Sequence, residues 1–368
     1  MHGTPIYCED GNVYFINGNN LVDGKIVISA ETKKVNESQQ STADKSLDDT
    51  TILMSINGTI GNLAYYSGER LMLGKSAAYI KVSEFDKRFV YAYLQAPSVQ
   101  GYFMDSLTGT TIKNLGLKAI REMIMFIPQD VDEQKRIGKF FDYLDNLITL
   151  HQRKYNKLLN VKKSMLEKMF PKNESNIPEI RFKGFTDPWE QRKLGDTNTF
   201  FTDGNYGEAY PKASDMTDSS TGIPFLTGGN LKNGRLDLSG ANYITYEKHM
   251  KLTSGHLAED DIVIAVRGSL GALGYVNKGN SGWNINSQLA ILRTDKTVLI
   301  GKYLIQFLLS TTGQKELLSK QTGSALKQLP ISSLKDIAIP VTSIEEQERI
   351  GMYLQNLDHL ITLHQREF

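Results

Sequence analysis

One long unit occurs twice in this chain. The run EQKRIG at residues 133–138 returns as EQERIG at residues 346–351, and the run LITLHQR at residues 147–153 returns unchanged at residues 360–366. The two copies of each run are 213 positions apart. Repeats of about 20–50 residues build solenoids, whereas a repeat this long is a whole domain with its connector. We therefore expect a pseudo-dimer on one chain, which suits a target with two halves.

The composition is ordinary and sets few limits. At 368 residues, with 40% hydrophobic and 23% charged residues, the chain can hold two or three globular domains. It has no apolar run of about 18 residues, and its first residues, MHGTP, carry no signal segment, so we expect a cytoplasmic protein without a membrane span. The single cysteine, Cys8, excludes an internal disulfide. The net charge of +1 excludes no partner, because the charge that matters for binding is local.

Residues 128–170 and 340–368 are predicted to form long amphipathic helices. Apolar residues recur in both at alternating spacings of four and three, the a and d positions of a heptad. The first helix can reach about 55 Å at about 1.5 Å per residue, and Pro171 ends it. The seam positions are Ile137, Phe141, Leu144, Ile148, His151, Tyr155 and Leu158 in the first helix, and Ile350, Leu354, Leu357, Ile361 and His364 in the second.

Two similar seams in one chain are most simply explained if they pack on each other, and helices joined through a domain would then run antiparallel. The alternative is that each helix packs only on its own globular domain. His151 and His364 occupy seam positions in both helices. A polar residue there is expected to fix the register of the two helices rather than to bind a metal ion.

The two globular segments correspond more weakly, but in the same order. ILMSINGTIG at residues 52–61 parallels IVIAVRGSLG at residues 262–271, and each predicts a buried strand that enters a glycine turn. TGTTIKNL at residues 108–115 parallels TGSALKQL at residues 322–329. The expected fold class is α+β, with two mixed α/β domains related by pseudo-two-fold symmetry and separated by long antiparallel coiled-coil helices. The expected boundaries are 1–127 for the first domain, 128–196 for the first helical spacer and its connector, 197–339 for the second domain and 340–368 for the second spacer.

These stretches resemble the specificity subunit of type I restriction–modification systems. The resemblance rests on residues 127–171, on IRFKGFTDPWEQRKLGD at residues 180–196 and on residues 339–366, and it covers essentially the whole chain. It implies two target recognition domains, each of which reads one half of a split site in double-stranded DNA. It also implies that the helical spacers set the distance between the halves and dock two modification (methyltransferase) subunits. Restriction (translocase and endonuclease) subunits are expected in the larger complex.

The resemblance further implies that this chain is not itself an enzyme. S-adenosylmethionine, and ATP with Mg, are expected on the partner subunits, and no cofactor is expected here. The residues agree, because an adenine methyltransferase carries a doubled proline and no two prolines are adjacent in this sequence. The run Gly74-Lys75-Ser76 has Glu69 where a P-loop needs glycine. The six histidines show no metal-ligand spacing, so no metal site is expected.

The chain departs from the family pattern at both ends. The lead WEQRKLGD at residues 189–196 has no counterpart before the first domain, and the second helix stops at the equivalent of Tyr155. We therefore expect one contiguous arc of about 58 residues to be missing from the repeat, as in a truncated gene, a recombination cassette or an expression fragment. The alternative function is that of an assembly-defective fragment that acts only as a protein-interaction module.

Candidate DNA contacts are polar residues at glycine turns, which can approach a groove closely, and lysines beside them. Arg267 is favoured because its first-copy equivalent is Asn57, and a residue that changes within a shared turn is where a different base would be read. The alternative is that the asparagines are turn formers and the lysines are solvated. The candidates are Asn20, Asn57, Thr59, Lys113, Asn230, Arg267, Ser269, Asn286, Gln288 and Lys327.

Overall fold

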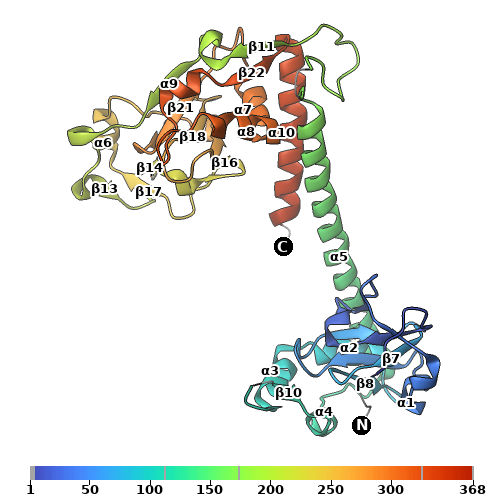
Figure 1. The fold of residues 1–368 in the computed structure, drawn as a ribbon. Coiled ribbons are helices and arrows are strands. Elements are labelled where there is room, and N and C mark those ends of the chain that lie inside the picture. The colour runs from blue at the N-terminus through green and yellow to red at the C-terminus, as the bar shows by residue number, and fades with distance from the viewer. Residues whose placement is uncertain (1–4, 112, 173–174, 325, 367–368) are drawn as a thin grey trace. The chain divides into compact units, whose positions relative to one another are not determined.

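The structure, a computed structural model, describes residues 5–111, 113–172, 175–324 and 326–366. The chain forms two compact units, unit 1 (residues 1–150) and unit 2 (residues 151–368), each with its own hydrophobic core (Figure 1). Among the helices in these described ranges, none is both long and apolar enough to cross a membrane.

Unit 1 is organised around β5 (Thr51–Ser55), every residue of which is buried. β5 lies between β6 (Leu63–Tyr65) and β8 (Ala77–Lys81) and pairs antiparallel with both. Helices α2 (Lys87–Leu94) and α3 (Pro97–Asp105) pack on this sheet. The other elements of unit 1 are β1 (Val13–Ile16), β2 (Leu21–Val22), β3 (Lys25–Ile26), β4 (Lys34–Val35), α1 (Thr42–Lys45), β7 (Leu71–Leu73), β9 (Leu107–Thr108), β10 (Asn114–Leu115) and α4 (Leu117–Glu122).

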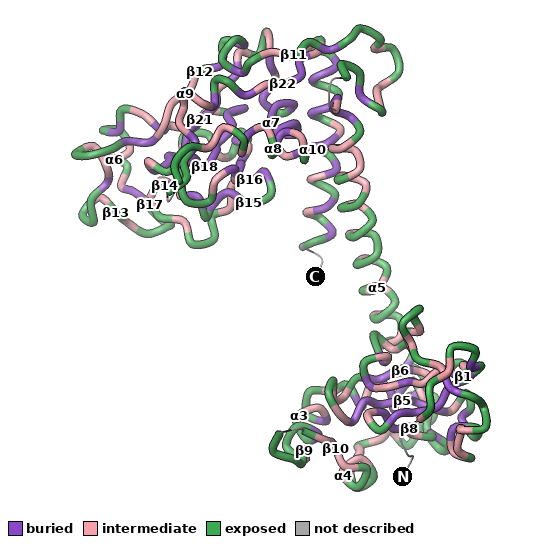
Figure 2. Tube along the Cα trace, in the orientation of Figure 1, coloured by how far each residue is buried: buried purple, intermediate pink, exposed green. Residues whose placement is uncertain are grey.

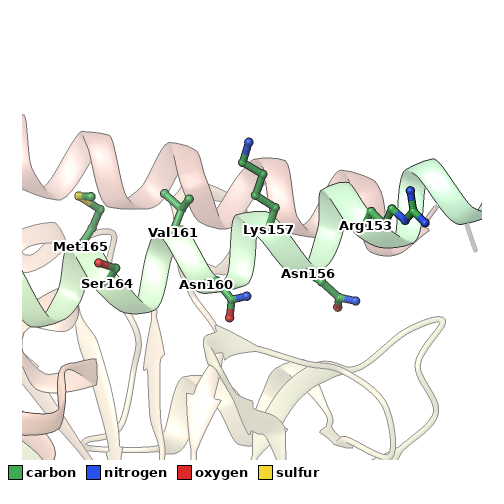
Figure 3. Close-up of a pocket in the computed structure, with 7 residues that line it drawn as sticks. All are labelled: Arg153, Asn156, Lys157, Asn160, Val161, Ser164 and Met165. Atoms are coloured by element: carbon green, nitrogen blue, oxygen red, sulfur yellow. The ribbon is translucent and has the colours of Figure 1, made fainter. Parts of the chain in front are cut away.

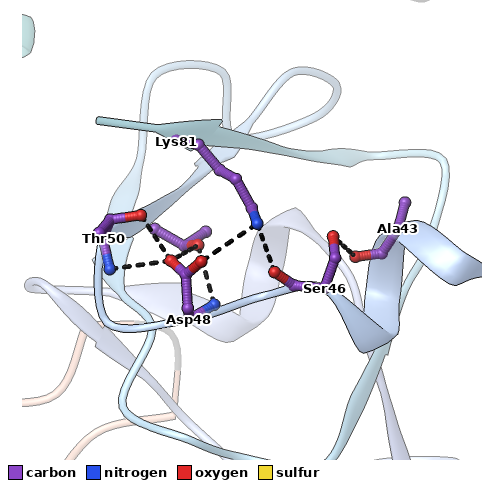
Figure 4. Close-up of polar contacts among 6 residues, drawn as sticks. Ala43, Ser46, Asp48, Thr50 and Lys81 are labelled. Carbon is purple, nitrogen blue, oxygen red and sulfur yellow. Dashed lines mark hydrogen bonds and ion pairs between the residues drawn. The ribbon is translucent and has the colours of Figure 1, made fainter. Parts of the chain in front are cut away.

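A polar network fixes the loop that leads into β5 (Figure 4). The Asp48 carboxylate accepts hydrogen bonds from the Thr50 hydroxyl at 2.5 Å and from the Lys81 ammonium at 3.2 Å. Lys81 also donates to the carbonyl of Ser46, which joins the loop to β8. The bonds from Thr50 and then Lys81 lower the pKa of Asp48 to about 2, because they stabilise the charged carboxylate.

Unit 2 repeats this arrangement within a larger sheet. β18 (Ile262–Ala265) lies between β19 (Leu273–Tyr275) and β21 (Leu289–Arg293), antiparallel to both, in the strand order β12-β21-β18-β19-β16-β15. Helices α7 (Gly301–Leu309) and α8 (Thr311–Ser319) cover it. The other elements of unit 2 are β11 (Glu190–Lys193), β12 (Phe200–Asp203), β13 (Met216–Thr217), β14 (Ile223–Leu226), β15 (Leu231–Lys232), β16 (Gly234–Leu236), β17 (Asn242–Ile244), α6 (Tyr246–Lys251), β20 (Asn284–Ile285), α9 (Ile331–Lys335) and β22 (Ala338–Val341). The predicted pair of mixed α/β domains is confirmed.

The two long helices are also present. α5 (Val131–Lys168) is one helix of 38 residues, and α10 (Ile344–Arg366) has 23 residues. Within unit 2, the second part of α5 runs antiparallel to α10, as predicted (Figure 1). The rings of His151 and His364, which are equivalent positions of the repeat, lie 5.6 Å apart. Farther along the pair, Lys162 forms an ion pair with Asp358.

The apolar seam is buried along α10 but not along all of α5 (Figure 2). Ile350, Leu354, Leu357, Ile361 and His364 are each at most 8% exposed. On α5, Ile137, Leu144, His151, Tyr155 and Leu158 are partly buried, whereas Phe141 and Ile148 are 46% and 56% exposed. The seam on α5 therefore differs from the continuous one that we expected, because no second helix covers these two side chains within unit 1 as described.

Each long helix also packs on its own domain, so the alternative packing contributes as well. Ile350, Leu354 and Leu357 share a core with Tyr303 and Leu304 of α7, while Ile137 packs on the core of unit 1. The seam of α10 thus faces both α7 and the second part of α5, whose Leu158 contacts the same core.

The repeated Glu-Gln run explains how each long helix meets its domain. Gln134 is buried and accepts a hydrogen bond from the backbone N–H of Asp86, at the start of α2, at 2.9 Å. Gln347 is buried and accepts one from the N–H of Ile300, at the start of α7, also at 2.9 Å. One turn later, a Cβ at Gly138 would lie 2.7 Å from Phe89, so glycine permits the close approach of α2 to α5.

Candidate nucleic-acid interface

The central strand of each unit ends in the same exposed turn. After β18, Gly268 and Gly271 have φ angles of +72° and +78°, and after β5, Gly58 and Gly61 have φ angles of +77° and +90°. Only glycine adopts this conformation without a steric cost. Arg267 and Asn57, which precede the first glycine, therefore occupy turns with the same glycine backbone conformation in the two units.

A hairpin docks against each turn. In unit 2 the hairpin is closed by an antiparallel bridge between Thr322 and Gln328, and Leu329 donates a backbone hydrogen bond to the carbonyl of Val266 at 2.9 Å. The backbones of Arg267 and Gln328 form an antiparallel bridge. In unit 1, Leu115 donates to Ile56 at 2.8 Å, and Asn57 forms the same bridge with Asn114. The segments that the sequence paired between the two copies therefore also make equivalent backbone contacts.

These contacts gather several of the predicted residues in unit 2. The N–H groups of Val266 and Arg267 both lie within hydrogen-bonding distance of the Gln288 carbonyl, at 2.9 and 3.2 Å. The side chains of Arg267, Gln288, Ser269 and Lys327 are all exposed. Asn286 is 5% exposed, and its side-chain oxygen accepts the N–H of Gln288 at 3.0 Å, so it holds the shape of this segment. In unit 1, the exposed candidates are Thr59 and Lys113, with Asn57 half-buried.

Two candidates have structural contacts instead. The amide of Asn230, 2% exposed, accepts the N–H of Thr227 and donates to the carbonyl of Asp237, both at 2.9 Å. Asn20 makes the same bonds in unit 1, with Asn17 at 2.9 Å and Val27 at 3.0 Å. Because both ends of each amide already have partners, these asparagines act as turn formers, the alternative that the sequence left open.

Sequence reasoning missed one residue of this surface. The guanidinium carbon of Arg267 lies 5.6 Å from the centre of the Tyr206 ring. The Tyr206 hydroxyl lies 2.9 Å from a carboxylate oxygen of Asp203, at the end of β12, and 3.0 Å from the carbonyl of Ser287. Partial burial, and then the Asp203 carboxylate, raise the pKa of Tyr206, so its proton stays available for these acceptors.

Other features of the described residues offer less chemistry. A shallow groove on α5 is lined by Arg153, Asn156, Lys157, Asn160, Val161, Ser164 and Met165 (Figure 3). All seven residues come from one helix, so a ligand would meet walls on one side only. In the described part of the chain, no three His, Cys, Asp or Glu side chains are grouped to hold a metal ion.

The two domains thus have the same central strand pairing, and in each an exposed polar turn is bridged by a second segment of the chain. Comparison with known families identifies the class. The chain belongs to the family described by the type I restriction modification DNA specificity domain, whose model matches residues 5–160 and 186–367. The predicted family is confirmed.

Similar proteins come from several organisms. A Methanocaldococcus jannaschii protein, provisionally named the MjaX type I restriction enzyme specificity subunit, is 25% identical over 337 residues, which cover 84% of this chain and 71% of that protein. The EcoBI specificity subunit of Escherichia coli is 21% identical over 312 residues, 80% of this chain and 64% of that protein. The crystal structure of a type I system S subunit from M. genitalium has the same fold, with a TM-score of 0.60 at 16% identity over 98% of this chain and 86% of that one. The alternative of a mere interaction module is not favoured by these relatives.

Proposed function

We propose that this chain is the DNA-recognition subunit of a type I restriction–modification complex and that each unit reads one half of a bipartite double-stranded site. The observation that carries the proposal is the same turn-and-hairpin surface in both units, with Asn57 in one and Arg267 in the other. A shared backbone with different polar side chains is what two readers of different half-sites require.

The residues on this surface match the chemistry of DNA. Lys113 and Lys327 occupy equivalent positions in the two hairpins. Both are exposed, which suits contacts to phosphate oxygens. The Arg267 guanidinium can donate two parallel hydrogen bonds to O6 and N7 of guanine, whereas the Asn57 amide pairs best with adenine. Thr59, Ser269 and Gln288 can donate to or accept from base edges.

The chemistry of the complex is assigned to its partners. We infer that two modification subunits dock on the helical spacers and methylate adenine with S-adenosylmethionine, and that restriction subunits use ATP with Mg. The chain itself serves as the non-catalytic reader in the cytoplasm. The specificity subunits among its relatives support this division of labour.

Methylome sequencing tests the proposal directly. The chain is expressed with its neighbouring modification subunit in a host that lacks adenine methylation of its own. We expect N6-methyladenine in one motif with two short defined halves and a gap of fixed length. A contiguous motif, or methylation that does not depend on this chain, would contradict the proposal.

A further inference from the structure

We propose that Tyr206 is a positioning residue for base reading: its ring supports the Arg267 guanidinium in the orientation that reads a base pair, and Asp203 and Ser287 hold the ring in place. This inference rests on the proposed function of the Arg267 turn. In this proposal Tyr206 contacts Arg267 and not the DNA.

The contacts form a chain from the sheet to the guanidinium. Asp203 ends β12, which pairs with β21 in the six-stranded sheet, so its carboxylate has a rigid base. The Tyr206 hydroxyl lies within hydrogen-bonding distance of this carboxylate and of the Ser287 carbonyl. Ser287 immediately precedes Gln288, whose carbonyl lies within hydrogen-bonding distance of the Arg267 N–H at 3.2 Å. The Tyr206 hydroxyl and the Arg267 backbone thus contact the carbonyls of two consecutive residues, Ser287 and Gln288.

Arginine needs such support more than other readers do. Its side chain has several rotatable bonds, and holding it in one rotamer costs conformational entropy on binding. A guanidinium over an aromatic face is attracted to the ring and keeps its edge free for hydrogen bonds. Tyr206 is 45% exposed and Arg267 is exposed, so the ring and the guanidinium near it both lie at the surface.

Asn57 provides the internal comparison. It occupies the same turn in unit 1, and its backbone bridges Asn114 as the backbone of Arg267 bridges Gln328. The asparagine side chain has only two rotatable bonds, so holding it in one orientation costs less conformational entropy than holding an arginine. The ring beneath Arg267 is therefore the feature that the longer reader requires.

The test compares two single variants with the double variant, and the quantity measured is the base preference at each position of the motif. The wild-type chain, Arg267→Ala, Tyr206→Ala and the double variant, each in complex with the modification subunit, are used to select from a library of random-sequence DNA duplexes. Arg267→Ala should relax one position of the motif about tenfold or more, and Tyr206→Ala should relax the same position. The double variant should be no worse than Arg267→Ala, because the ring acts only through the arginine.

Control variants separate orientation from folding. Tyr206→Phe keeps the ring but loses the hydroxyl, and should give an intermediate loss at that position. Tyr206→Leu fills the space without an aromatic face and should behave like Tyr206→Ala, so it carries the test if the alanine variant loses its cooperative thermal unfolding. Tyr246→Ala, at an exposed tyrosine on α6, should leave the motif unchanged.

The outcomes distinguish the two proposals. If the wild-type complex selects no bipartite motif, the proposed function fails. If Arg267→Ala relaxes one position while the folded Tyr206 variants do not, only the role of Tyr206 fails. If Tyr206→Ala weakens binding to every sequence equally, the ring contacts DNA itself, and the positioning role is overturned.

Discussion

Asn57 and Arg267 occupy the same turn with different side chains, and we propose that this difference sets what each unit reads. Both precede a glycine in the left-handed region, and both have a backbone that bridges the neighbouring hairpin. Since the backbone is common to both turns, the proposed function implies that a change of side chain at this position changes the target. If Tyr206 supports Arg267 as proposed, a substitution of Arg267 that changes the base read should be accompanied by a substitution of Tyr206.

The Asp48 network predicts an unusual titration. Its pKa of about 2 lies below the ordinary 3.8 because of hydrogen bonds from Thr50 and then Lys81. A lowered folded-state pKa stabilises the fold above the unfolded pKa, and this contribution is lost as the pH falls from about 4 toward 2. We expect NMR titration of the carboxyl group to show a midpoint near pH 2 in the native protein. Thr50→Val should raise the midpoint, because it removes the single hydrogen bond with the largest effect.

Two further variants check the cause of the low pKa. Lys81→Met should also raise the midpoint, because it removes a hydrogen bond and a positive charge that both stabilise the carboxylate. Lys118→Met, at an exposed lysine that pairs with Glu122, should leave it in place. A midpoint near 3.8 in the native protein would contradict the network.

At the scale of elements, the seam offers a matched pair of isoleucines. Ile361 on α10 is 8% exposed, and its repeat equivalent on α5, Ile148, is 56% exposed. Ile361→Ala should lower the free energy of unfolding by about 2 kcal/mol or more, since it removes most of a buried side chain and leaves a cavity. Ile148→Ala should change it by no more than about 0.5 kcal/mol. Urea unfolding of the isolated chain measures both, and equal losses would contradict the burial described here.

The connector after α5 supplies a second contrast. The side chain of Glu346 is fully buried and accepts hydrogen bonds from Arg181 Nε at 2.7 Å and from Trp189 Nε1 at 3.1 Å. Glu346→Ala should cost about 3 kcal/mol or more in unfolding free energy, because Arg181, 12% exposed, loses its counter-charge. The neighbouring Glu345 pairs with Arg349 at the surface, so Glu345→Ala should cost about 0.5 kcal/mol or less. Similar costs for the two variants would show that the buried pair does not hold the connector.

The elements show what the sequence could and could not predict. Heptad spacing identified both long helices and their antiparallel course, because periodicity records which face is apolar. It could not predict that Phe141 and Ile148 are exposed, since spacing does not say what covers a face. Equivalent turns were found because the repeat supplied two copies for comparison. Tyr206 was missed because its role depends on a contact with Arg267, 61 positions away, which no local pattern records.

For the whole molecule, we expect substitutions in the two units to affect the two halves of the motif independently. Asn57→Ala should relax one position in one half of the selected motif, and Arg267→Ala one position in the other half, each by about 1–3 kcal/mol of discrimination. The double variant should show both changes with their separate sizes, because the effects of residues that share no partners add. Selection from random duplexes measures all three. A single variant that alters both halves would show that the units do not read separately.

The two buried glutamines have a consequence for which substitutions each domain tolerates. Gln134 and Gln347 each hold a recognition domain through one backbone N–H at the start of a helix. A backbone group is present whatever side chain the domain carries there, except proline. This hydrogen bond therefore does not depend on the side chain at the start of the domain helix, whereas the buried apolar contacts of each long helix do depend on the side chains of its domain.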